Sequence, residues 1–437
     1  MRTFLTATIL LLSGNIWAQE PTDTLTTAPP KENKFTIDVN MLTRGEIRNG
    51  GLNNTQDEQT AAFVIERTLL GMQYERAGLT TRVTAQHSGT WGSNESSSFN
   101  LYEAWMQLKS KNGLFAKAGR QDLSYDDQRI FGADHWAMTA ASHDALVLGF
   151  EKKGHKIHLM GAYNQNVKNM NGGNYFTGGI QPYKAMEALW YHYDVPKVPL
   201  GISVLGMNIG MQSNLDYSDT CTYNQQLIGT YLHYHPKKLS AELAFYYQMG
   251  KEENGLRLGA WMASAKLQYM PNEKLTVYGG YDYLSGDKNF NVPPKGMIGM
   301  MRHDKVRGFN SIFGSHHKFY GAMDFFYLTT YYASFTPGLQ NYFVGCKWKP
   351  MPKLSADLAY HYLAVAADIE DTKKGLGHEI EASVRYQLMK DVRLSAGYSF
   401  MRGTDTMVAL KRSSEDRLLR WGWVMISVSP KVFTTMW

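Results

Sequence analysis

Apolar and polar side chains alternate along most of the chain from residue 34 onward, in segments of about ten residues. In the segment 239–248, for example, Leu243 and Phe245 fall on one parity and Ser240 and Glu242 on the other. Successive side chains of a β-strand point to opposite faces, so each segment predicts a strand with one apolar face and one polar face. The pattern predicts about 18 strands, over residues 34–48, 60–77, 79–91, 98–110, 113–124, 143–153, 155–166, 182–194, 200–214, 222–235, 238–250, 257–270, 274–286, 338–349, 354–366, 377–388, 392–403 and 419–430.

The connections between these strands are alternately short and long. The short ones lie at Ala77-Gly78, Lys111-Asn112, Gly154, Pro196 to Pro199, Pro236-Lys237, Pro271-Asn272, Met351-Pro352 and Met389-Lys390. A soluble β-sandwich has no physical reason to sort its loops in this way, whereas outer-membrane barrels have short periplasmic turns and long extracellular loops. We therefore predict an all-β fold, a transmembrane antiparallel β-barrel of about 18 strands in the cell outer membrane.

The composition and the N-terminus agree with this class. Mean hydropathy is −0.36, and after the N-terminus no run reaches the roughly 18 apolar residues of a membrane helix. Residues 1–18 read as a signal peptide, with Arg2, an apolar run over 4–12 and a cleavage site after Ala18; a buried N-terminal element is the alternative. Residues 19–33 lack periodicity and predict a flexible periplasmic lead-in, and residues 34–437 predict the barrel.

The connection 287–337 is about fifty residues long, far beyond an ordinary loop. It holds the aromatic stretch FGSHHKFYGAMDFFYLTTYY. A surface loop, a hidden strand pair and a segment folded into the lumen are the three interpretations. The density of Phe and Tyr favours packing against a wall, because loops in water rarely carry so many large apolar side chains.

Three motifs resemble a known family. GRQDLSYDDQRIFG lies at 119–132, GYDYLSGD at 280–287 and FGSHHKFYGAMDFFY at 313–327. Together with the strand pattern, they are similar to the alginate-export family of outer-membrane porins, in particular its Bacteroidetes-type branch. The resemblance implies a monomeric barrel of eighteen strands. In the founding members of the family, an arginine-rich lumen passes an anionic polysaccharide outward, and the resemblance implies the same activity here.

The charges predicted to face inward depart from that family. The positive ones are Arg44, Arg67, Arg82, Lys109, Lys117, Lys156, Lys266, Lys347, Arg385 and Arg393. The negative ones are Glu46, Glu75, Glu103, Glu242, Asp282, Asp357, Glu379 and Glu381. A conduit for a polyanion should concentrate positive charge along its wall. The mixed set predicts a porin for passive passage of small hydrophilic solutes at least as well as one for a polysaccharide.

The residues expected to line or constrict the pore are Arg82, Glu103, Lys117, Arg120, Asp127, Arg129, Asp282, Arg302, Arg307 and Arg385. We expect Arg120, Asp127 and Arg129 to form a charged cluster with Glu103, which narrows the lumen or holds a loop inside it. A charge facing lipid at the membrane midplane costs roughly 2–4 kcal/mol, which favours an inward orientation for all four.

Two rival classes of function remain at this stage. An outer-membrane enzyme acting on lipid would need Ser and His on the outer face, where His87 is the one candidate, with Ser88 on the other side of the strand. A soluble periplasmic saccharide-binding β-protein is the other class. The neighbouring Asp126 and Asp127 point to opposite faces and are a poor catalytic pair. We predict that the chain is not an enzyme.

No cofactor or metal is expected. His316-His317 and the pair His233 and His235 resemble metal ligands in their spacing, but no third ligand is identifiable nearby. The two cysteines, Cys221 and Cys346, argue against a disulfide framework.

The expected partners follow from the predicted location. They are outer-membrane lipid and lipopolysaccharide, the barrel-assembly machinery, and a small hydrophilic solute or polysaccharide. The net charge of +6 comes without a basic run, so no nucleic acid is expected.

Overall fold

The computed structural model describes residues 33–49, 60–165, 176, 181–213, 221–287, 305–326, 336–369, 372–411 and 418–437. The predicted signal peptide and all of the lead-in except Asn33 lie outside these residues. No helix in the described part of the chain is long and apolar enough to cross a membrane.

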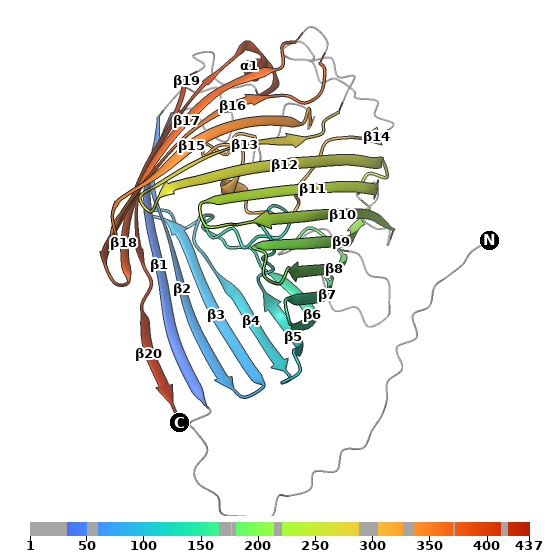
Figure 1. Ribbon diagram of the computed structural model, residues 1–437, viewed down its shortest axis with the longest axis vertical. Coiled ribbons are helices and arrows are strands. Elements are labelled where there is room, and N and C mark those ends of the chain that lie inside the picture. Colours follow the sequence, from blue (N-terminus) through green and yellow to red (C-terminus); the bar gives the residue numbers. More distant parts are fainter. Residues whose placement is uncertain are drawn as a thin grey trace, which may run out of the picture.

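Eighteen long strands form one closed antiparallel barrel (Figure 1). They are β1 (Lys34–Asn49), β2 (Ala61–Arg76), β3 (Leu79–Thr90), β4 (Ser98–Lys109), β5 (Leu114–Gln121), β6 (His143–Lys152), β7 (His155–Tyr163), β8 (Ala185–Asp194), β9 (Leu200–Gln212), β10 (Thr222–Tyr234), β11 (Leu239–Lys251), β12 (Arg257–Asn272), β13 (Leu275–Leu284), β15 (Leu339–Met351), β16 (Leu354–Ala364), β17 (Gly375–Met389), β18 (Val392–Gly403) and β19 (Leu418–Val428). Each pairs with the next, and β1 also pairs with β19 over nine residues, from Met41↔Val428 to Asn49↔Arg420, which closes the wall. The predicted fold class and strand number are confirmed.

Four short elements complete the described structure. They are β14 (Lys305–Val306), β20 (Lys431–Met436), the helix α1 (Asp405–Lys411) and a single 3-10 turn over His316–Lys318. Neither β14 nor β20 adds a strand to the wall: β14 pairs with the beginning of β12, and β20 with the beginning of β1.

The two faces of the wall differ in polarity as the alternation predicted. Along β6, Leu146 and Leu148 are exposed, whereas Ala145 and Val147 are buried toward the lumen. The same outward exposure of large apolar side chains recurs around the barrel, for example at Val204 on β9. No second sheet covers this face among the described residues, so its apolar surface suits contact with lipid.

The short connections are tight turns, as the sequence predicted. Between β6 and β7 the chain reverses through Lys153 and Gly154, which have φ angles of +53° and +83°. A Cβ on Gly154 would lie 2.7 Å from the carbonyl oxygen of Asp194, so the neighbouring strand approaches too closely for any other residue. Glycine at this turn therefore fixes both the reversal and the packing of β7 against β8.

A proline separates the last strand of the wall from the short strand that ends the chain. Past Val428, the last residue of β19, the chain continues as β20 along the lower part of β1 (Figure 1). The main chains of Asn33 and Trp437 bond to each other in both directions at 3.1 Å. Pro430, which has no N–H to donate, accepts a bond from Val39 and lies between the two strands.

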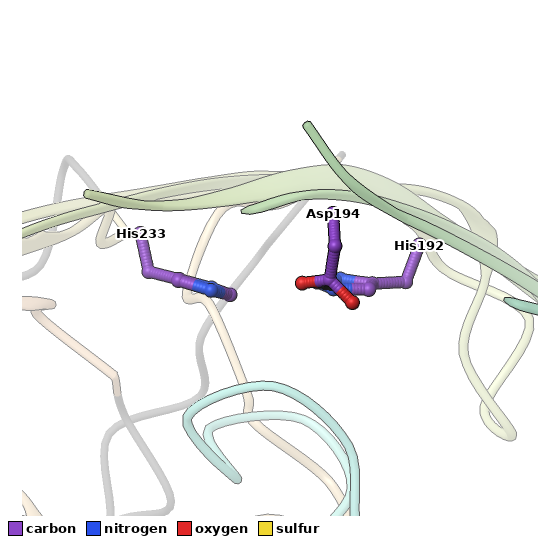
Figure 2. Close-up of side chains that lie close together, drawn as sticks. All are labelled: His192, Asp194 and His233. Carbon is purple, nitrogen blue, oxygen red and sulfur yellow. Dashed lines mark hydrogen bonds and ion pairs between the residues drawn. The ribbon is translucent and has the colours of Figure 1, made fainter. Parts of the chain in front are cut away.

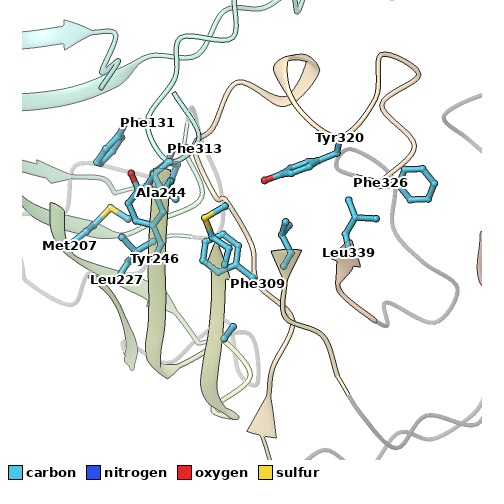
Figure 3. Close-up of a cluster of buried hydrophobic side chains, with 14 of the residues drawn as sticks. Phe131, Met207, Leu227, Ala244, Tyr246, Phe309, Phe313, Tyr320, Phe326 and Leu339 are labelled. Carbon is cyan, nitrogen blue, oxygen red and sulfur yellow. The ribbon is translucent and has the colours of Figure 1, made fainter. Parts of the chain in front are cut away.

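The buried core lies inside the barrel. Figure 3 shows Phe131, Phe309 and Phe313 packed against wall residues such as Met207 and Tyr246. The three phenylalanines come from connections between strands, residues 122–142 and 305–326, and not from the wall itself. Two connections therefore fold into the lumen. For the described part of the long connection, the in-folded interpretation is confirmed.

Candidate functional site

The first in-folded connection, residues 122–142, joins β5 to β6 and contacts the wall at β1 and β2. Arg67 on β2 donates from Nη1 to the carbonyl oxygens of His135 and Ala137, at 3.0 and 2.9 Å. Arg44 on β1 donates to the carbonyl oxygen of Trp136 at 3.2 Å. Arg44 and Arg67 are themselves buried, and buried donors need such acceptors. The two arginines therefore fix this connection to the wall of β1 and β2.

The second in-folded segment, residues 305–326, packs on the first. The ring of His317 stacks on Trp136 at 4.0 Å and 9°, and Lys318 Nζ donates to the carbonyl oxygen of Asp127 at 2.8 Å. Glu379 on β17 accepts a bond from the main-chain N–H of Met323 at 2.9 Å, while being itself fully buried. The segment is therefore fixed both to the first connection and to the wall.

Arg129 joins both in-folded segments to the wall. Its Nε lies 3.0 Å from Asp127 Oδ2, and its Nη1 lies 3.1 Å from Asp282 Oδ1 on β13 and 3.0 Å from the hydroxyl of Tyr320. Nη2 donates to Ser264 Oγ on β12 at 3.0 Å. Burial by itself would lower the pKa of Arg129, but Asp282, Tyr320 and Asp127 together hold it well above the usual value. The guanidinium is thus a permanent buried cation with paired donors.

A cavity of about 860 Å³ lies between the in-folded segments and the wall of β10 to β19. Among the described residues, its lining holds six Lys or Arg side chains and seven carboxylates. The cations are Arg129, Lys266, Lys318, Lys347, Arg385 and Arg393, and the carboxylates are Asp126, Asp127, Asp134, Glu242, Asp282, Asp357 and Glu381. The two signs are nearly balanced, and they alternate between neighbouring strands: Lys347 on β15 lies 3.7 Å from Asp357 on β16.

The structure divides the residues expected to line the pore into groups. Asp127, Arg129, Asp282 and Arg385 line this cavity. Arg82 and Glu103 form a separate ion pair at 2.8 Å on the wall of β3 and β4.

The remaining expected residues lie elsewhere. Lys117 lies 4.1 Å from the ring of Trp105. The main-chain N–H of Arg307 bonds to Asp287, and Arg302 lies outside the described residues.

The expected cluster of Arg120, Asp127, Arg129 and Glu103 is wrong in two of its members. Arg120 pairs with Asp144 through two contacts of 2.8 Å, and Asp144 falls on the parity of the exposed Leu146. Glu103 binds Arg82 instead. Arg120 nevertheless lines a second cavity, of about 360 Å³, together with Tyr102 and the in-folded Ala140 and Phe313. Its charge is compensated by the pair with Asp144.

The sequence did not predict which side chains of the wall and of the in-folded segments contact one another. Trp136, Tyr320 and Glu379 are central to that contact, and nothing in their local sequence distinguishes them from other loop or strand residues. The available signals were the density of Phe and Tyr in the connection 287–337, which predicted packing against a wall, and the charged residues of the motif at 119–132.

On the outer face, His87 lies close to a serine other than Ser88. Its Nε2 is 3.1 Å from Ser97 Oγ, and its Nδ1 is 3.8 Å from Glu66 Oε1. The second distance is too long for a hydrogen bond, and Glu66 accepts a bond from Trp91 Nε1 at 2.9 Å. The carboxylate therefore does not orient the imidazole as a hydrolytic triad requires.

No protein-family model matches the chain, and no curated protein matches it. Solved structures do share its fold over nearly the whole length. OccK2 (OpdF) of Pseudomonas aeruginosa has a TM-score of 0.62 at 13% identity, covering 91% of this chain and 98% of that chain. A BenF-like porin from Pseudomonas fluorescens Pf-5 has a TM-score of 0.60 at 12% identity, covering 92% and 99%. The chain thus has the fold of outer-membrane porins, while the alginate-export family is not matched.

Proposed function

We propose that the chain is an outer-membrane channel for passive passage of small hydrophilic solutes. The observation that carries this proposal is the lumen: a closed barrel narrowed by two in-folded segments, with a cavity lined by charges of both signs. Rings of charged side chains set the selectivity of a pore through their electrostatic field. Nearly equal numbers of opposite charges leave a small net field, which suits neutral or zwitterionic solutes.

The same balance separates this proposal from the export of a polyanion. A wall that carried mainly arginine would attract an anionic polymer along its whole length. Here Glu242, Asp357 and Glu381 lie among the cations of the same cavity. One of the similar structures, OccK2, is described in complex with glucuronate, so glucuronate, a sugar with one negative charge, is the charged solute to compare with neutral saccharides.

Planar-bilayer recording tests the proposal. We expect stable single channels with a reversal potential close to zero in a salt gradient, and a reduced current when small saccharides are added. Strong anion selectivity together with block by anionic oligosaccharides would instead favour a polysaccharide exporter. Fractionation into the outer membrane and heat-modifiable gel mobility would support the location, and a soluble periplasmic species would contradict it.

An outer-face lipid hydrolase is the rival function, supported by the contact of His87 with Ser97. Two tests separate it from a channel: labelling with a fluorophosphonate probe, and release of fatty acid from phospholipid vesicles. We expect neither for the native chain. Labelling that disappears in S97A and H87A would establish the enzyme instead.

A further inference from the structure

Three polar side chains meet on the lumen side of β8, β9 and β10, at the short-turn end of the barrel. The ligand atoms of His192, Asp194 and His233 all lie within 4.8 Å of one another. Figure 2 shows the three side chains extending from the same face of the sheet. His192 and Asp194 are two residues apart on β8, so they share a face of the strand.

Strand register and a glycine allow His233 to join them. Asp194 pairs with Gly201 on β9, and Gly201 pairs in turn with His233 on β10, so the three lie in one row across the sheet. Any side chain at position 201 would separate the two outer residues. A Cβ there would overlap the ring of His233 and lie 2.9 Å from His192 Cε1. The glycine therefore leaves the two imidazoles facing each other, with ring centroids 5.6 Å apart.

Hydrogen bonds fix which nitrogen of His192 faces the cluster. Ser203 Oγ lies 2.5 Å from Asp126 Oδ1, a carboxylate that can only accept, so the hydroxyl hydrogen points there. Ser203 must then accept from His192 Nδ1, at 2.8 Å. In the neutral ring this leaves Nε2 with a lone pair, 2.9 Å from Asp194 Oδ1. These two acceptor atoms can be joined either by a shared proton or by a metal ion that both of them bind.

We propose that His192, Asp194 and His233 bind a divalent transition-metal ion, with zinc as the best match. Two imidazoles and one carboxylate are typical zinc ligands, and a site with three protein ligands keeps one position open for water or a solute group. Calcium and magnesium prefer sites made of oxygen alone. Ser203 acts as the outer partner that orients the histidine, as is usual for histidines that bind metals.

The geometry needs only a small adjustment to close around an ion. Ligand atoms bound to one zinc lie about 3.3 Å apart, given bond lengths of about 2.0–2.1 Å. The 2.9 Å between His192 Nε2 and Asp194 Oδ1 must therefore lengthen slightly, whereas the longer distances in the cluster, which do not exceed 4.8 Å, must shorten. The relative exposure of the Asp194 side chain, 52%, also makes the site reachable from water. Among the described ion pairs, Asp194 has one neighbouring Lys or Arg: Lys156 Nζ lies 3.4 Å from Asp194 Oδ2. A bound zinc ion would compete with this ammonium group for the carboxylate.

Equilibrium dialysis of the untagged, detergent-purified chain against zinc chloride, followed by metal analysis, tests the site. We expect one zinc ion per chain with an affinity in the micromolar range, not displaced by excess magnesium. H192A, D194N and H233A should each weaken binding by at least about tenfold, and S203A by about tenfold, the low end of the usual effect of losing an outer partner.

H155A is the matched control. His155 lies on β7 beside Tyr193, on the outward parity of Ile157, so its loss should leave zinc binding unchanged. Heat-modifiable mobility of every variant shows whether its barrel is intact. Absence of stoichiometric zinc on the native chain, or equal zinc binding by native chain and H233A with an intact barrel, would overturn the proposal.

Discussion

At the scale of single residues, Arg129 joins four separate parts of the described structure. It contacts two in-folded segments and two wall strands through paired donors. Removing one partner of a buried ion pair costs roughly 3–5 kcal/mol, because the other charge is left without compensation. Arg129 therefore has a much larger role than an exposed pair on the same barrel.

Replacing Arg129 by Met should release the in-folded segments without opening the wall. Asp127 and Asp282 would lose their common cation, so we expect larger and noisier single-channel currents and faster proteolysis within residues 122–142. K109M is the control, since Lys109 forms an exposed pair with Glu151 at 2.7 Å and such pairs contribute about 0–1 kcal/mol. Equal conductance of R129M and the native chain would contradict this role.

Glu252, in the connection between β11 and β12, gives a pH-dependent prediction. Burial, followed by the nearby Asp287 and Glu253, raises its pKa from 4.5 to about 7. The folded connection therefore holds a proton that the unfolded one releases above its ordinary pKa, so local stability falls as pH rises from about 4.5 to about 7.

Hydrogen exchange measures this effect. After correction for the intrinsic rate, exchange of the Gly255 amide, which bonds to the carbonyl of Glu252, should accelerate across that pH range. E252Q should remove the dependence; the same acceleration in E252Q would assign it to another group.

At the scale of elements, the connections at the long-loop end have two different roles. The connection between β3 and β4, residues 91–97, remains at the rim, and Trp91 is exposed. The segment 305–326 is instead fixed inside the lumen, where Asn310 exchanges two hydrogen bonds with Gln248 on β11. Aromatic content separates the two, because only the second carries enough apolar surface to stabilise burial.

Replacing residues 310–323 by a short Gly-Ser linker should therefore raise single-channel conductance. The same kind of replacement over residues 93–96 is the control and should leave conductance unchanged, because that connection does not enter the lumen. If the first replacement had no effect while the barrel remained intact, the wall and residues 122–142 would set the narrowest point alone.

At the scale of the whole molecule, selectivity depends on the sum of the charges in the lumen. Arg385 and Arg393 lie on neighbouring strands and line the same cavity. Their combined replacement by Glu changes the charge of the cavity by four units toward negative, so the reversal potential should shift toward cation selectivity.

K353E combined with K390E is the matched control for this prediction. It makes the same change of charge in exposed short turns. At a salt concentration of about 1 M the Debye length is only about 3 Å, so charges outside the lumen are screened and the potential should not shift. An equal shift in both double variants would show that total charge, and not the cavity, sets selectivity.

The barrel itself could be predicted from the sequence. Side chains of a strand alternate with a period of two residues, and those that face lipid are apolar. Each strand can therefore be recognised from its own segment of sequence. The parity of short and long connections then gave the direction of every strand. The pairing of β20 with the beginning of β1 required the register.

The sites depended on tertiary structure for a physical reason. Arg129 and Asp282 are separated by more than 150 residues, and parity assigns a side chain to a face without assigning it a partner. Arg120 and Glu103 were given the wrong partners on that account. His233 had no visible third ligand in the sequence, because His192 and Asp194 approach it only across β9, at Gly201. Local alternation fixes faces, whereas the relative shift of neighbouring strands and the path of loops inside the lumen decide which side chains meet.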